Sequence, residues 1–132
     1  MHAVAHKMVE KGKGILAADE STPTCTKRFA SINTDSTTES RNFYRNMLFT
    51  TEDIEKYISG IILFDETFHQ SELSSGMKFP EYLTSKNNVT IIEWGDLLED
   101  LLPSRTITVN FTRIISSKDS RNIKISGIKF IG

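Results

Sequence analysis

The chain has 132 residues, 38% of them hydrophobic, which is enough for one small domain with a modest core. Lysine and arginine total 16 against 17 acidic residues, so the formal net charge is −1 and predicts no nucleic-acid partner. The start of the chain lacks the continuous apolar core of a signal peptide, and no apolar run approaches the roughly 20 residues of a membrane span, so we expect no membrane partner. Because Cys25 is the single cysteine, no internal disulfide can form, and we expect a cytoplasmic protein.

The first apolar run of the chain ends in a pair of carboxylates. Residues 2–11 show helical spacing of apolar side chains, and glycines end that short helix. Residues 15–18 have no polar alternation, which predicts a strand that is buried on both faces. Asp19 and Glu20 follow directly, and burying two carboxylates costs free energy unless they meet cations or hydrogen-bond donors. Both a functional site and a solvent-exposed strand end fit this pattern.

Two helical patterns separate this strand from the next apolar run. They cover residues 23–32 and residues 39–50, and Thr37 or Thr38 can cap the second helix. Helical spacing predicts a buried apolar face on the second helix, formed by Phe43, Tyr44, Met47 and Leu48. The nearby arginines are interpreted as solvated surface residues: Arg28, Arg41 and Arg45.

A second apolar strand, at residues 57–67, also ends in an acidic pair, Asp65 and Glu66. Two buried strands joined by helices imply a parallel crossover, which brings both carboxyl ends to one edge of a sheet. In open α/β sheets and in (β/α)₈ barrels, that edge carries the chemistry. The sequence therefore predicts an α/β fold with its site at this edge.

The pattern changes after residue 88. Residues 89–94 predict a third strand, and residues 104–131 alternate between apolar and polar side chains as an antiparallel β-hairpin with one solvated face does. We therefore expect a boundary near residues 86–88, with one domain at residues 1–88 and a second at residues 89–132.

Motifs for metals and phosphate-binding cofactors are missing from the sequence. The histidines are too scattered to form a ligand set, and no phosphate loop of the form G-x-x-x-x-G-K-[ST] occurs. Cys25 lies near a predicted helix start, where a thiol can be reactive, but we interpret it as a small buried residue. We expect neither a metal nor a cofactor.

Several long blocks of the first 88 residues carry a resemblance to a known family. The blocks "GKGILAADESTPTCTKRFASI", "TESRNFYRNMLFT" and "YISGIILFDETFHQ" together resemble the amino-terminal part of the class I fructose-1,6-bisphosphate aldolases. The resemblance implies an incomplete (β/α)₈ barrel, with its first two parallel strands and their helices, followed here by the antiparallel hairpin. It also implies a glycolytic lyase that cleaves fructose 1,6-bisphosphate to triose phosphates.

The same resemblance implies site residues. Asp19 and Glu20 would be active-site carboxylates, and Ser21, Thr24 and Arg28 would contact the phosphate of a sugar phosphate substrate. In that family a lysine on a late barrel strand forms the Schiff base with the keto substrate, and no lysine of this chain matches it. We therefore expect the chain to be inactive by itself, and whether it acts as an enzyme stays open.

A second resemblance concerns residues 89–132. They resemble the carboxy-terminal end of the bacterial ATPase that helps to make threonylcarbamoyladenosine in tRNA, on the strand end Glu93-Trp94, the pair Leu102-Pro103 and the closing hairpin. This resemblance implies an alternative function, in which the chain is a fusion remnant that acts as a binding or assembly module without catalysis. Two barrel strands also leave an open sheet edge, through which the chain could associate with itself.

Overall fold

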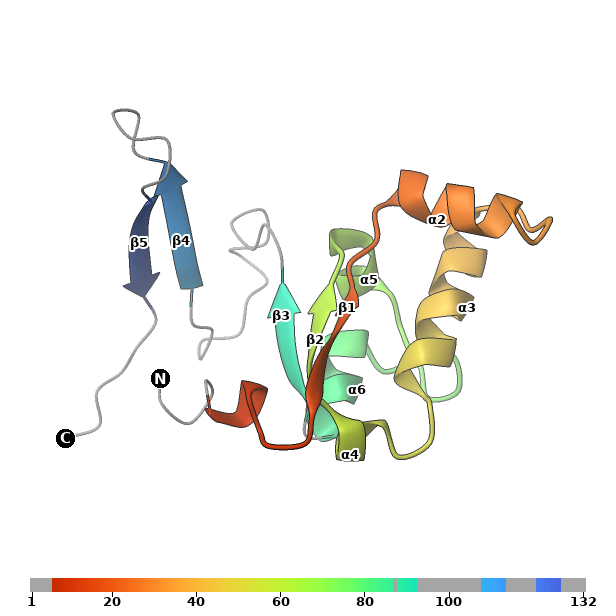
Figure 1. The fold of residues 1–132 in the computed structure, drawn as a ribbon. Helices are drawn as coiled ribbons and strands as arrows, with labels where there is room; N and C mark the ends of the chain where they lie inside the picture. The colour runs from red at the N-terminus through yellow and green to blue at the C-terminus, as the bar shows by residue number, and fades with distance from the viewer. Residues whose placement is uncertain (1–5, 87, 93–107, 114–120, 127–132) are drawn as a thin grey trace. The chain divides into compact units, whose positions relative to one another are not determined.

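A computed structural model describes residues 6–86, 88–92, 108–113 and 121–126 (Figure 1). The chain divides into two compact units, residues 2–93 and residues 94–132 together with residue 1, and each unit is described by itself. The expected features at Glu93-Trp94 and at Leu102-Pro103 lie outside the described residues.

The first unit is built on a parallel three-stranded sheet (Figure 1). Its strands, in the order β1-β2-β3, are β1 (Gly14–Ala18), β2 (Ile58–Leu63) and β3 (Val89–Ile92). Ala18 pairs with Leu63, and Leu63 pairs with Ile92, so the three strands end at one edge of the sheet. The predicted parallel arrangement of the first two strands is confirmed.

The third strand belongs to the same sheet as the first two. β3 pairs with β2 from Gly60 and Val89 to Leu63 and Ile92. Asn88, which is only 3% exposed, donates from Nδ2 to the carbonyl oxygen of Ile58 at 2.6 Å. The two compact units divide at residues 93 and 94. The expected domain boundary near residues 86–88 stays a prediction.

Local sequence signals set the helix ends. The helices are α2 (Thr22–Ala30), α3 (Thr38–Phe49), α4 (Ile54–Tyr57), α5 (Asp65–His69) and α6 (Phe79–Ser85), and residues 6–8 are also helical. Thr37 caps α3 as predicted, because its hydroxyl accepts from the amide of Ser40 at 3.1 Å while its own amide donates to the Ser40 hydroxyl at 2.9 Å. Past α2, Asn33 has a φ of 53°, a left-handed conformation in which Asn is commoner than most residues.

The core lies between the sheet and the helices. It consists of Ala18 from β1, Ile61 and Leu63 from β2, and helical residues Phe49, Ile54, Phe79 and Leu83. The prediction that the first strand is buried on both faces is wrong, since Ile15 is 43% exposed while Ala18 is fully buried. β1 is an edge strand of the described sheet, and only its Leu16 and Ala18 side packs on the core.

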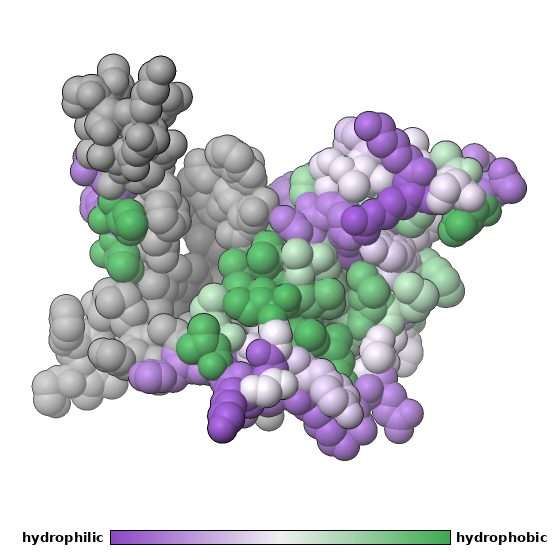
Figure 2. Space-filling model, in the orientation of Figure 1, coloured by the Kyte–Doolittle hydropathy of each residue, from purple (hydrophilic) through white to green (hydrophobic). Residues whose placement is uncertain are grey.

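Figure 2 shows apolar side chains gathered on the sheet face turned to the viewer.

The second unit contains an antiparallel strand pair. β4 (Thr108–Arg113) and β5 (Arg121–Ser126) pair from Thr108 and Ser126 to Arg113 and Arg121, inside the predicted hairpin. The connection at residues 114–120 lies outside the described residues. Across all the described parts of the chain, no helix has the length and apolar character needed to cross a membrane.

Candidate active site at the carboxyl edge of the sheet

The acidic pair after β1 lies between the end of that strand and the start of α2. Ala18 is the last residue of β1 and Thr22 the first of α2, so Asp19 and Glu20 occupy the sheet edge. Asp19 is half-buried, and its side chain receives no hydrogen bond from the residues that the structure describes. The carboxylate of Glu20, by contrast, is surrounded by donors.

The inner side of Glu20 faces a buried arginine. Arg45, which is 2% exposed, donates from Nη1 to Oε2 of Glu20 and from Nη2 to the carbonyl oxygen of Glu20 at 2.9 Å. Its Nε reaches Oγ1 of Thr67 on α5 at 3.3 Å. One side chain of α3 therefore ties the end of β1 to the helix that follows β2.

The outer side of Glu20 faces two further donors. Oε1 accepts from Nη1 of Arg28 and from the hydroxyl of Tyr44 at 3.2 Å, and Arg28 Nη1 also donates to the Tyr44 oxygen at 3.1 Å. The Arg28 side chain is 53% exposed, so this partner of Glu20 lies next to solvent. We call Glu20, Arg28, Tyr44 and Arg45 the Glu20 cluster.

The cluster keeps Glu20 ionised. Burial raises the pKa of Glu20, but the hydrogen bond from Arg45, the backbone amide and the charges of Arg45 and Arg28 outweigh it, so the pKa lies below its ordinary value. An ionised carboxylate can accept hydrogen bonds and protons, and at neutral pH it has no proton to donate. The arrangement therefore suits a hydrogen-bond acceptor, while the lowered pKa makes Glu20 a weaker base than an ordinary glutamate.

The structure brings together some of the site residues expected from the sequence. Arg28 binds Glu20, whereas the hydroxyls of Ser21 and Thr24 bond to each other at 3.1 Å in the first turn of α2. Cys25 is buried, as predicted, and burial raises the pKa of its thiol. Its Sγ lies 3.8 Å from the carbonyl oxygen of Glu20, so this thiol packs under the cluster.

Sequence reasoning missed the arginines of α3. The prediction that Arg41 and Arg45 are solvated is wrong, because the side chains of both turn to the strand ends and are 12% and 3% exposed. The predicted apolar face is wrong at Phe43 and Met47, which are 63% and 52% exposed. A usable signal was present, since two arginines one helical turn apart match two acidic strand ends.

Arg41 binds the acidic pair after β2. Its Nε and Nη2 donate to the two oxygens of Glu66 at 2.7 and 2.6 Å, a bidentate pair between α3 and α5. The side chain of Asp65 is 52% exposed, as expected for a strand-end carboxylate. Arg41 therefore binds both oxygens of the glutamate at this second strand end, while Arg45 reaches only the Thr67 hydroxyl there.

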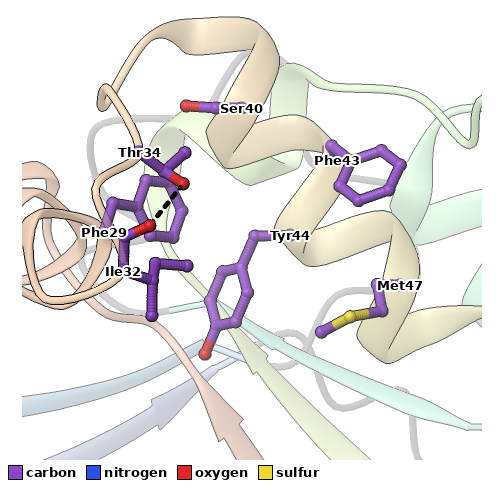
Figure 3. A pocket seen from close by; sticks show the side chains of 7 residues that line it. All are labelled: Phe29, Ile32, Thr34, Ser40, Phe43, Tyr44 and Met47. Atoms are coloured by element: carbon purple, nitrogen blue, oxygen red, sulfur yellow. Dashed lines mark hydrogen bonds between the residues drawn. The ribbon is translucent and has the colours of Figure 1, made fainter.

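A small hollow lies between the end of α2 and α3 (Figure 3). It has a volume of about 350 Å³ and is lined by Phe29, Ile32, Thr34, Ser40, Phe43, Tyr44 and Met47. The ring of Tyr44 packs edge-on against Phe29, with centroids 5.6 Å apart, while its hydroxyl belongs to the Glu20 cluster. The hollow is therefore adjacent to the site but apolar in character.

The fold and the site define an α/β protein whose charged groups gather at the carboxyl edge of parallel strands. Within the described residues, no group of three metal-ligating side chains comes together. Residues 1–110 match the model of the family described as glycolytic fructose-bisphosphate aldolase class-I. The chain belongs to this family.

Individual relatives agree with this assignment. Fructose-bisphosphate aldolase 2 of Caenorhabditis elegans is 48% identical over 89 residues, which cover 67% of this chain and 24% of the relative. Fructose-bisphosphate aldolase A of Salmo salar is 50% identical over 91 residues, 68% of this chain and 25% of the relative. The chain thus spans about a quarter of the length of these curated relatives.

A solved structure shows the same likeness. The fructose-bisphosphate aldolase of Plasmodium falciparum, crystallised with TRAP and a small molecule inhibitor, is similar with a TM-score of 0.64 and 34% identity. The match covers 92% of this chain and 31% of that one. The predicted resemblance to class I aldolases is therefore confirmed as family membership.

Proposed function

We propose that this chain carries the β1 end of a class I fructose-bisphosphate aldolase active site, with fructose 1,6-bisphosphate as the substrate. The observation that carries the proposal is the Glu20 cluster, an ionised carboxylate between a buried and an exposed arginine at the carboxyl edge of the sheet. Family membership supports a sugar phosphate as the substrate. The half-exposed guanidinium of Arg28 supports it too, because sugar phosphates are anionic and arginine is a suitable partner for phosphate.

Each expected site residue has a role in this proposal. Asp19 and Glu20 act as the active-site carboxylates. Asp19 receives no hydrogen bond from the described residues, and Glu20 is held ionised by its cluster. Arg28 binds the substrate phosphate with its exposed guanidinium. The hydroxyls of Ser21 and Thr24 turn from each other to the same phosphate, at the cost of one exposed hydrogen bond.

The segment by itself does not cleave the substrate in this proposal, because the chemistry needs a lysine that forms a Schiff base. Three of the described lysines have contacts away from the Glu20 cluster: Lys13 binds Glu10, Lys56 binds Asp53, and Lys78 donates to the His69 carbonyl oxygen. We propose that the imine lysine of the family has no counterpart in this chain.

Trapping of the imine tests this proposal. The full chain is incubated with dihydroxyacetone phosphate, reduced with borohydride and weighed by intact mass spectrometry, with a complete class I aldolase as the positive control. We expect an unmodified mass for this chain and an adduct on the control. An adduct on any lysine of this chain would overturn the proposed inactivity.

Three further expectations stay as proposals. A cytoplasmic location is consistent with the single cysteine. Self-association through the edge of β1 is consistent with the exposure of Ile15 there, and sedimentation velocity would detect it. The ATPase resemblance of residues 89–132 stays a prediction, and the reach of the aldolase family match to residue 110 favours a shared ancestry through β3.

A further inference from the structure

One buried side chain fixes both the backbone and the carboxylate of Glu20. Arg45 uses three guanidinium nitrogens, Nη1 for Oε2 of Glu20, Nη2 for its carbonyl oxygen at 2.9 Å, and Nε for Oγ1 of Thr67 at 3.3 Å. A guanidinium that is 2% exposed needs an ionised partner, because leaving it unpaired would cost several kcal/mol. The buried positions of Arg45 and Glu20 therefore each require the opposite charge of the other residue.

The two oxygens of Glu20 have different surroundings. Oε2 meets Arg45 on the buried side, where the Arg45 side chain is 3% exposed. Oε1 meets Arg28 and Tyr44 on the open side, where the Arg28 side chain is 53% exposed. Of the two oxygens, Oε1 is the one with a partner that borders solvent, so a ligand that displaces Arg28 would meet Oε1 before Oε2.

We propose that Arg45 is a positioning residue, which holds the Glu20 carboxylate in place and presents its Oε1 oxygen to a bound sugar phosphate. The proposal rests on the proposed function for the identity of that ligand. In this role Arg45 never touches the ligand, and it acts only through Glu20. Glu20 then accepts a hydrogen bond from a substrate hydroxyl.

The groups that face Glu20 explain why Arg45 is decisive. From α2 come Arg28, whose side chain is half exposed to water, and Cys25, a thiol with a raised pKa caused first by burial. From α3 come Tyr44 and Arg45, and from α5 only the hydroxyl of Thr67 lies in contact with the cluster. Without Arg45, the burial of Glu20 would remain, and Arg28, the other described cation that lowers its pKa, would be screened by solvent.

The experiment is a carboxyl ¹³C NMR titration of the glutamates in the full chain, with the Glu20 resonance assigned through a Glu20→Gln variant. In the wild type we expect Glu20 to titrate below its ordinary value of 4.5. In Arg45→Met we expect it to titrate at a higher pH than in the wild type, since burial remains while the hydrogen bond and charge of Arg45 are gone. Arg45→Lys, which keeps the charge and loses the three-point contact, should give an intermediate value.

Arg41→Met is the matched control. Arg41 lies one turn before Arg45 on α3 and binds Glu66 of α5, but no hydrogen bond or ion pair joins it to Glu20. This variant should lose stability and leave the titration of Glu20 unchanged. Far-ultraviolet circular dichroism at each pH confirms that the variants compared are folded.

Several results would overturn the role of Arg45. The first is a Glu20 pKa at or above 4.5 in the wild type. The second is a Glu20 pKa in Arg45→Met that equals the wild-type value. The third is a change in the Glu20 pKa in Arg41→Met as large as the change in Arg45→Met. If Arg45→Met does not fold, the role of Arg45 is judged from the wild type and Arg45→Lys. A Glu20 pKa in Arg45→Lys equal to that in the wild type would mean that the positive charge alone sets the pKa and that the three contacts of Arg45 are not needed. Imine trapping plays no part in this titration, so the proposed function and the role of Arg45 can fail separately.

Discussion

The ends of β1 and β2 are alike in sequence and different in structure. Asp19 and Glu20 follow β1 directly, whereas Asp65 and Glu66 come after Phe64 and begin α5. Each glutamate binds an arginine of α3, Glu20 with Arg45 and Glu66 with Arg41. Arg41 uses both oxygens of Glu66. Arg45 uses one oxygen of Glu20, and the other meets the half-exposed Arg28.

The difference shows what separates a structural ion pair from a site. A bidentate pair satisfies its carboxylate and holds two helices together. Glu20 is less exposed than Glu66, at 12% against 26% of the side chain, but its partner Arg28 is half exposed, so a ligand can compete for Arg28 at the β1 end. The same motif, an apolar strand followed by Asp-Glu, thus produces a structural end at β2 and a candidate active-site end at β1.

The largest expected effect comes from removing the buried arginine of the β1 end. Arg45→Met leaves Glu20, whose side chain is 12% exposed, without its inner partner. Breaking a buried pair in this way costs about 3–5 kcal/mol, so we expect a loss of that order in the free energy of unfolding. Urea denaturation of the full chain measures it. A loss as small as that of a surface substitution would show that Arg45 is not needed at this end.

A smaller loss is expected at the β2 end. Arg41→Met removes two charge-assisted hydrogen bonds from Glu66, whose side chain is 26% exposed, and should cost about 2 kcal/mol. The same urea denaturation gives the value. A cost equal to that of Arg45→Met would remove the energetic difference between the two ends.

The cap of α3 should affect both ends together. Thr37→Ala removes the hydroxyl that accepts from the Ser40 amide at 3.1 Å, and such a cap contributes about 1 kcal/mol. Thr37→Ser keeps the hydroxyl and serves as the control, with little change expected. Urea midpoints for the two variants check this, and equal midpoints would contradict the capping role.

Acid should weaken the β1 end through Glu20. Its pKa is lower in the folded than in the unfolded chain, so its contribution is complete above about pH 4.5 and is lost as the pH falls through the folded value. Glu20→Gln should therefore show a flatter fall in unfolding free energy below pH 4.5 than the wild type. Parallel curves for the two proteins would mean that Glu20 has the same pKa in both states.

The smallest effect on stability is expected for Arg28→Ala. This side chain is more than half exposed, and exposed ion pairs contribute little. The midpoint of urea denaturation should stay within error of the wild type. A clear loss would place Arg28 among the structural residues of the β1 end, beside Arg45.

Local signals were enough to predict much of this fold. The apolar runs at β1 and β2 and the threonine cap of α3 depend on neighbouring residues, and the structure has each of them. The glutamates after the strands were also visible as candidates. What hydropathy could not give is which face of α3 is buried, since Phe43 and Met47 are exposed while the arginines turn inward.

The partners of those arginines explain the error. Glu20 and Arg45 are 25 residues apart in the chain, as are Arg41 and Glu66, so no local window contains either pair. A buried carboxylate at a strand end is stabilised by a cation, and this requirement outweighs the apolar periodicity of the helix. Pairing acidic strand ends with arginines of the intervening helix would have found both contacts.

The most direct test of the account is an amide ¹H–¹⁵N NMR titration of the full chain with fructose 1,6-bisphosphate. If the β1 end is the ligand-binding end, the signals of Glu20, Ser21 and Arg28 should move in a saturable way while those of Asp65 and Glu66 stay in place. Equal movement at both strand ends, or no movement at the β1 end at millimolar ligand, would contradict the account.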